Sequence, residues 1–174
     1  MKTTIAVVAA IIAVIALLYV TTTPTPPSEM TEADRQDVVG EVQRTFDAWI
    51  ATGPTNDLDA AMGFFLDDAS AEFLGEPVVF VNRLRAYATK AEIVEAFEPA
   101  IAGRSGTNYT TTNNSFAVLS RDAVMQAYEG TYSITNLEGV SGADYPLTVT
   151  ILWVRRDRAW KILHLHQSWS TDVE

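Results

Sequence analysis

The carboxy-terminal part of the chain carries four long segments in which apolar and polar side chains alternate. Alternation with a period of two is typical of a strand whose two faces meet different surroundings. Turn-forming residues separate the segments, which indicates hairpins and therefore an antiparallel sheet. The four predicted strands span residues 109–119, 123–135, 147–156 and 159–169.

Three segments with a helical period precede these strands. Thr31 with Asp34 forms a variant capping box before an apolar stripe that repeats every three or four positions. Asp57 is placed to cap a second, shorter helix, and Thr89-Lys90-Ala91-Glu92 has the full capping-box pattern for a third. A short strand is expected over 71–74. Helices followed by hairpins predict an α+β fold in which a curved antiparallel sheet wraps the long helix.

The amino-terminal segment is of a different kind. Residues 5–20 carry no charge, Lys2 gives a positive start, and Pro-Thr-Pro-Pro follows at 24–27. Such a run is typical of a membrane anchor or a secretory signal, and the lack of a good small-x-small cleavage site favours the anchor. The domain is then expected outside the cytoplasm, tethered to the cell membrane, or secreted if the segment is cleaved. The predicted organisation is a signal anchor or signal peptide at 1–23, a linker at 24–30, one domain at 31–170 and a tail at 171–174.

Composition excludes several classes of function. The chain has 22 Asp and Glu residues against 12 Lys and Arg, a formal charge of −10. This balance argues against nucleic-acid binding, which needs a basic face. The chain has no cysteine, which rules out disulfides, thiolate zinc sites and a cysteine nucleophile. We expect neither a metal nor a cofactor.

The last predicted hairpin resembles that of a known family. Residues 153–168 combine a tryptophan-containing strand, a charged turn and the pattern Trp-Lys-Ile-x-His-x-His-x-Ser. This pattern resembles the closing hairpin of SnoaL-like proteins, which belong to the nuclear-transport-factor-2-like (NTF2-like) superfamily, and the association domain of calcium/calmodulin-dependent protein kinase ends similarly. Phe64–Ala69 and Ser120–Val124 add weaker matches. The resemblance covers about residues 31–170.

What the resemblance implies is a cone-shaped α+β barrel with a pocket between the helices and the concave face of the sheet. It also implies frequent dimers through the outer face, so a homodimer is expected. It does not imply one function, because this fold hosts enzymes, ligand binders and assembly modules.

Family positions with known chemistry can be compared with this chain. Ketosteroid-isomerase-type members place a general-base aspartate at a position that matches Phe73, and a second acid near Thr150 or Ile151. The kinase association domain lines its pouch with arginines whose positions match Gly130, Ile151 and Gln167. None of these residues is charged, which counts against both kinds of site.

Alternation along the closing strands predicts which side chains face the pocket. If Gln167 faces it, so do Leu163, Trp169 and the other odd-numbered residues of that strand. The cavity would be aromatic and mostly neutral, which suits an apolar or aromatic small molecule. The alternative is that these side chains simply fill the core. The predicted ligand-binding residues are Tyr128, Tyr132, Ile151, Trp153, Leu165 and Gln167.

His164 and His166 lie two positions apart, so both are expected on the face opposite Gln167. They could form a metal site with a carboxylate such as Glu129. The family motif places histidines here in proteins with unrelated activities, which favours a structural role in or beside the dimer interface.

Three functions stay open. The leading hypothesis is a binding module with an apolar pocket. The second is a cyclase, dehydratase or isomerase-type enzyme that uses Asp67 or Asp68, Tyr128 and Gln167 as acid–base and polar groups. The more ordinary role for the two aspartates is to end a helix in solvent. The third hypothesis is an assembly module that pairs through its sheet.

Overall fold

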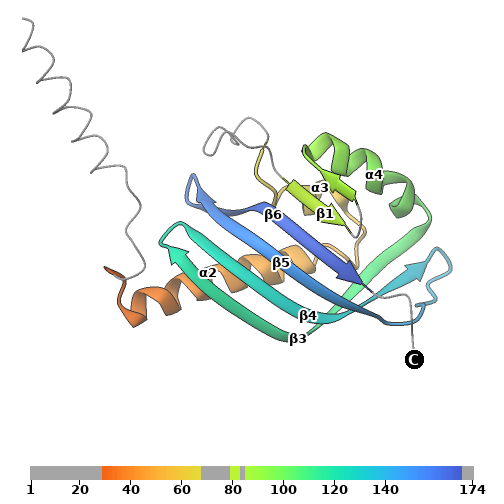
Figure 1. Cartoon of the computed structure of the whole chain (residues 1–174). Coiled ribbons are helices and arrows are strands. Elements are labelled where there is room, and N and C mark those ends of the chain that lie inside the picture. The colour runs from red at the N-terminus through yellow and green to blue at the C-terminus, as the bar shows by residue number, and fades with distance from the viewer. Residues whose placement is uncertain (1–28, 68–78, 83–84, 170–174) are drawn as a thin grey trace, which may run out of the picture.

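The computed structural model describes residues 29–67, 79–82 and 85–169. These residues form helices and one sheet, whose four long strands curve across α2 (Figure 1). The elements are α2 (Glu32–Ile50), α3 (Leu58–Met62), β1 (Val79–Asn82), β2 (Arg85–Tyr87), α4 (Lys90–Ala102), β3 (Arg104–Ser120), β4 (Ala123–Asn136), β5 (Tyr145–Arg156) and β6 (Ala159–Trp169).

Each helix begins at the residue that the sequence predicts. The Thr31 hydroxyl accepts a hydrogen bond from the Asp34 amide at 3.1 Å, and the Asp34 carboxylate accepts one from the Thr31 amide at 3.0 Å. Thr89 accepts from the Glu92 amide at 3.2 Å, again within a complete capping box. Asp57 accepts from the Ala60 amide at 2.8 Å. These bonds satisfy amides that a helix leaves free in its first turn.

The sheet has the strand order β2-β1-β6-β5-β4-β3. β3 to β6 form an antiparallel meander, as predicted, while β1 runs parallel to β6 and antiparallel to β2. The prediction missed β1 and β2, because both are short and the sequence around them mixes apolar and basic residues without a period. The α+β class and the curved sheet are confirmed.

Two predicted elements, the strand over 71–74 and the apolar segment within 1–23, lie outside the described residues. Among the helices that the structure describes, none has the length and hydropathy that a membrane crossing requires.

The core lies between α2 and the concave face of the sheet. α2 buries Val38, Val42 and Phe46, the stripe expected from its helical period. The Phe46 ring meets the Tyr128 ring edge-on at 5.1 Å between centroids, and Trp153 is fully buried. These side chains fill the inner part of the cone. The apolar surface that they bury stabilises the fold by about 25 cal/mol per Å².

A β-bulge interrupts the alternation of β6. Leu152 pairs with His164 but Trp153 pairs with Ile162, which leaves Leu163 as an extra residue. The Ile162 backbone also bonds the segment that follows α3, through the Phe64 carbonyl at 2.8 Å and the Leu66 amide at 2.9 Å. The inward-facing positions therefore change from odd to even numbers at the bulge, and Ile162 is fully buried opposite Trp153.

Candidate functional site

The best-formed candidate site is an aromatic pocket at the open end of the cone, beside α4. Its volume is about 260 Å³, and we call it the mouth pocket. α4 supplies one wall, and the ends of β2, β3, β4, β5 and β6 supply the others. The lining residues are Tyr87, Ala96, Phe97, Ala100, Arg104, Tyr109, Tyr132, Ile134, Leu147, Gln167 and Trp169.

Ring-to-ring packing shapes this pocket. Tyr132 meets Trp169 edge-on at 6.0 Å, and Tyr87 meets Phe97 edge-on at 6.2 Å between ring centroids. Tyr109 lies directly opposite Tyr132 in the pairing of β3 with β4. Edge-on contacts of this kind fix ring orientation, so the walls present preformed aromatic surface.

Gln167 places an amide in the aromatic pocket. It is half-buried on β6, opposite Val149 in the strand register. Within the described ranges, no hydrogen bond is made by its side chain. An amide in such a place gains from a partner, and a ligand in the pocket can supply one.

The other predicted ligand residues lie deeper. Tyr132 lines the mouth pocket with Gln167, whereas Tyr128, Ile151, Trp153 and Leu165 are buried in the core. These four side chains are at most 3% exposed and make up the packed floor beneath the pocket. Burial raises the pKa of the Tyr128 phenol far above its usual range, with a further rise from Tyr109, so this hydroxyl stays protonated.

The acid–base candidates are not part of the mouth pocket. Asp67 is exposed after α3 and pairs with the Lys90 ammonium at 2.8 Å. The hydrogen bond and charge of Lys90 hold the pKa of Asp67 below its ordinary value, which keeps this carboxylate ionised at neutral pH. Asp68 lies outside the described residues.

The two histidines lie on the convex side of β6. His164 pairs with Leu152 and His166 with Thr150 across the β5–β6 ladder, and neither lines the mouth pocket. His164 is half-buried and His166 is exposed. Among the described residues, no group of three or more His, Cys, Asp or Glu side chains is arranged to hold a metal ion.

The environment of His164 predicts a pH-dependent stability. Burial, and then the neighbouring His166, lower its pKa below the ordinary value of about 6.5. The unfolded chain therefore takes up this proton at a higher pH than the folded chain, so the free energy of unfolding falls as the pH drops below about 6.5. We expect the His164→Gln variant to lose less stability than the wild type between pH 7.5 and 5.5, measured by urea unfolding.

The matched control for this titration is His166→Gln, which keeps the burial of His164 and hence the larger part of its pH dependence. Identical pH dependence in the wild type and in His164→Gln would contradict the prediction.

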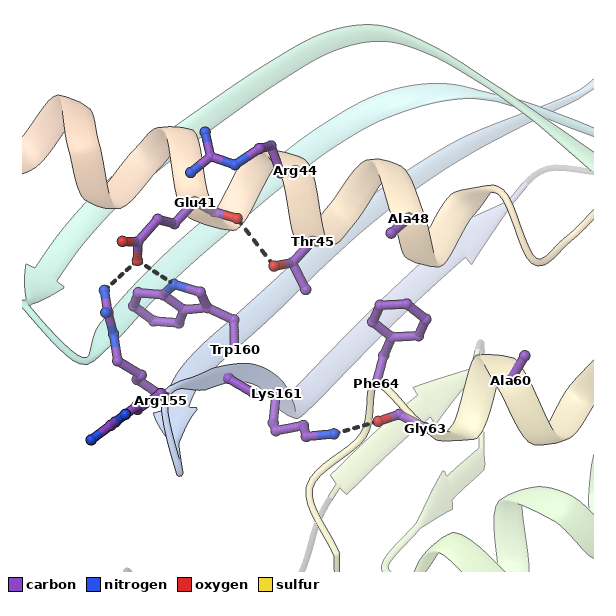
Figure 2. Close-up of a pocket in the computed structure, with 12 residues that line it drawn as sticks. Glu41, Arg44, Thr45, Ala48, Ala60, Gly63, Phe64, Arg155, Trp160 and Lys161 are labelled. Carbon is purple, nitrogen blue, oxygen red and sulfur yellow. Dashed lines mark hydrogen bonds and ion pairs between the residues drawn. The ribbon is translucent and has the colours of Figure 1, made fainter.

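A second cavity lies outside the cone, between α2, α3 and the β5–β6 hairpin (Figure 2). This outer groove has a volume of about 640 Å³ and includes Arg44, Arg155, Arg158 and Lys161 in its lining. Its polar groups largely serve the fold. Glu41 accepts hydrogen bonds from Arg155 and, at 3.0 Å, from the Trp160 indole. The Arg155 guanidinium also lies 4.7 Å from the centre of the Trp160 ring.

Lys161 also makes a contact within the fold. Its ammonium donates to the Gly63 carbonyl at 2.6 Å, which ties β6 to the end of α3 (Figure 2). The outer groove is thus held by contacts between its own walls, and the mouth pocket, with its unpartnered amide, is the better candidate site.

Sequence reasoning missed several residues of the mouth pocket. Arg104 precedes the predicted start of the strand at 109, so the alternating pattern does not include it. Tyr87 and Phe97 come from β2 and α4, whose position against the sheet no local pattern indicates. Tyr109 is the first residue of the predicted strand and lies within β3. Trp169 is the last residue of β6, and the alternation did predict that its side chain lies on the concave face.

Comparison with protein-family models gives one match. The model described as a SnoaL-like domain matches residues 42–172, which confirms the resemblance seen in the closing hairpin. Among curated proteins, none matches this sequence.

Solved structures share the fold over most of the chain. A candidate dehydratase of the NTF2-like family from Streptomyces avermitilis has a TM-score of 0.67 at 14% identity, with 79% of this chain and 99% of that chain covered. A candidate calcium/calmodulin-dependent protein kinase II association domain from Xanthomonas campestris has a TM-score of 0.63 at 19% identity, covering 86% and 94%. A candidate scytalone dehydratase from Novosphingobium aromaticivorans has a TM-score of 0.67 at 11% identity, covering 83% and 93%. At such identities the similarity shows the fold alone.

Proposed function

Because the chain belongs to the family of SnoaL-like domains, we propose that it binds a small aromatic molecule in the mouth pocket. The observation that supports this most directly is a preformed aromatic cavity that contains the half-buried amide of Gln167 without a hydrogen-bond partner among the described residues. Aromatic walls supply affinity through buried area, and one or two polar groups orient the ligand. The cavity of about 260 Å³ favours a ligand of one or two rings.

An enzyme is the second candidate, favoured by the dehydratases among the similar structures. Acid–base catalysis needs a group that can take or give a proton near neutral pH. Among the residues that the structure describes, the lining of the mouth pocket includes no Asp, Glu or His, and burial raises the pKa of Tyr109. Of the acid candidates, Asp67 is an exposed ion-pair partner, which leaves Asp68 for the enzymatic hypothesis. We therefore place binding ahead of catalysis.

The location of the protein in the cell and its oligomeric state are proposed from the sequence. The apolar run over 5–20 after Lys2 supports an exported, membrane-tethered domain, and the family resemblance supports a homodimer through the outer sheet face. Native mass spectrometry of the full-length protein purified from its host would report the mass of the assembly and of any retained small molecule.

Filling the mouth pocket should abolish binding. Ala96 lines the pocket from α4, and an Ala96→Trp variant places an indole where the ligand ring would lie while every polar group of the pocket stays. We expect the affinity for 2-naphthol, followed by intrinsic tryptophan fluorescence, to fall at least about tenfold, since a few contacts of an aromatic ring are worth 1–2 kcal/mol.

The matched control is Ala60→Trp, which adds the same side chain to the outer groove. This variant should bind 2-naphthol as the wild type does. Equal affinities for the wild type and Ala96→Trp, or no binding of 2-naphthol by the wild type at millimolar concentration, would overturn the proposal.

A further inference from the structure

The charge of the mouth pocket is unusual for this chain. The protein has 22 acidic residues and a formal charge of −10, yet the one charged side chain among the described lining residues is an arginine, Arg104. Arg104 is the first residue of β3 and is half-buried. A guanidinium that loses part of its water gains from an anionic partner.

Asn56 holds Arg104 in place. Its amide nitrogen donates to the Ile101 carbonyl at 2.9 Å and to the Arg104 carbonyl at 3.0 Å, and its amide oxygen accepts from Arg104 Nε at 3.3 Å. Asn56 has a φ of 56°, a left-handed conformation that asparagine tolerates better than most residues. Asn56, in the connection between α2 and α3, thus links the end of α4 to the start of β3 and holds the guanidinium of Arg104 through its Nε.

The two terminal nitrogens of Arg104 are left for another partner. Within the described ranges they make no ion pair with a carboxylate, since the five ion pairs found there involve other cations. Arg104 and Tyr109 line the same pocket, and burial raises the pKa of the Tyr109 phenol while the charge of Arg104 partly opposes this rise. The Arg104 guanidinium therefore lies among aromatic side chains, and its two terminal nitrogens are available to a ligand.

We propose that Arg104 binds the carboxylate of an aromatic acid whose ring lies among the aromatic side chains of the mouth pocket. The planar fork of a guanidinium matches a carboxylate with two parallel hydrogen bonds, which a point charge such as lysine cannot reproduce. Gln167 would then bond a second polar substituent. This inference rests on the proposed binding function and names the chemical class of its ligand.

A matched pair of probes tests the inference. 2-Naphthoate and 2-naphthamide have the same ring and nearly the same size but differ in charge. We expect the full-length wild type to bind 2-naphthoate at least about tenfold more tightly, because a paired hydrogen bond between two charged groups is stronger than one to a neutral amide. Isothermal titration calorimetry at low salt gives both affinities.

Three variants test whether Arg104 causes the preference for 2-naphthoate over 2-naphthamide. Arg104→Gln should bring the ratio of the affinities for 2-naphthoate and 2-naphthamide close to one. Arg104→Lys should retain part of the preference. Asn56→Gly keeps the left-handed backbone accessible but removes the contact to Arg104 Nε, so it should weaken the preference and leave amide binding in place. Arg121→Gln, at an exposed arginine that pairs with Asp34 in another part of the molecule, is the matched control and should behave as the wild type.

The failures of the two proposals are distinguishable. If the wild type binds both probes equally, or if Arg104→Gln keeps the preference for the acid, the carboxylate assignment is wrong while aromatic binding stands. If the wild type binds neither probe, the proposed function itself fails.

Discussion

A single methyl group at Gly130 should destabilise the protein by about 3 kcal/mol. In Gly130→Ala the new Cβ would lie 1.9 Å from the Thr110 carbonyl oxygen and 3.2 Å from the Thr111 Cα, both atoms of the β3 backbone. A backbone neighbour cannot rotate away as a flexible side chain can, so the two strands must separate. Urea unfolding followed by far-UV circular dichroism measures the loss.

The location of Gly130 makes this change relevant to the site. The β3–β4 register shifts between Thr111 and Asn113, opposite Gly130 and Glu129, and such a bulge increases the bend of a sheet. Tyr109 and Tyr132 pair just beyond this point. Separation of the strands should therefore move one wall of the mouth pocket, and Gly130→Ala should bind 2-naphthol more weakly even at temperatures where it remains folded.

Gly40→Ala is the matched control for this substitution. Gly40 lies within α2, where an added Cβ would meet only the Arg44 guanidinium at 3.5 Å. Because alanine is the better helix former, we expect the free energy of unfolding to rise by about 0.5–1 kcal/mol. A Gly130→Ala variant as stable as the wild type would mean that β3 and β4 lie farther apart here than the structure has them.

Local rules predicted the elements of this fold well. The capping residues Thr31, Asp57 and Thr89 each begin a helix, because the bonds that they make reach only three residues along the chain. The long strands follow from alternation, since three consecutive hairpins bring sequence neighbours together. The meander therefore needs little information beyond period and turns.

Features that depend on distant segments were not predicted. β1 lies beside β6 in parallel, although the two are about 80 positions apart in the sequence, and its four residues are too few for a periodic signal. The bulge at Leu163 accompanies pairing of Ile162 with the segment after α3. Alternation assumes a regular ladder, so it does not indicate that the inward-facing positions of β6 change from odd to even numbers at this point.

Arg104 lies outside the strand that alternation predicts, which begins only at 109. In the structure β3 starts at Arg104, and a Cβ on Gly106 would lie 2.7 Å from the Pro54 carbonyl oxygen. Gly106 therefore allows the α2–α3 connection to pack closely against the strand, and this packing also brings Asn56 to Arg104. The pocket's cation could be found only once this tertiary contact was known.

Removing the buried amide of Gln126 should cost about 2–3 kcal/mol. Gln126 is 0% exposed on β4, accepts a hydrogen bond from the Trp153 indole at 2.7 Å and donates to Oδ1 of the Asn114 side chain at 3.0 Å. Asn114 in turn donates to Gln43 on α2 at 2.9 Å. Gln126→Leu keeps the volume but leaves the Trp153 donor without a partner inside the core, which is the costly outcome for a buried polar group.

A double-mutant cycle with Trp153→Phe separates this orphaned donor from the change in packing. Phenylalanine has no N–H, so the double variant Gln126→Leu/Trp153→Phe leaves no indole unsatisfied, and its loss of stability should be smaller than the sum of the two single losses by about 1 kcal/mol or more. Asn114→Ala removes both the acceptor of the Gln126 amide and the link to Gln43 on α2, and it should cost about 1–2 kcal/mol. Strictly additive losses in urea unfolding would mean that the bond between Gln126 and Trp153 contributes nothing of its own. The network would then only fill space between the sheet and α2.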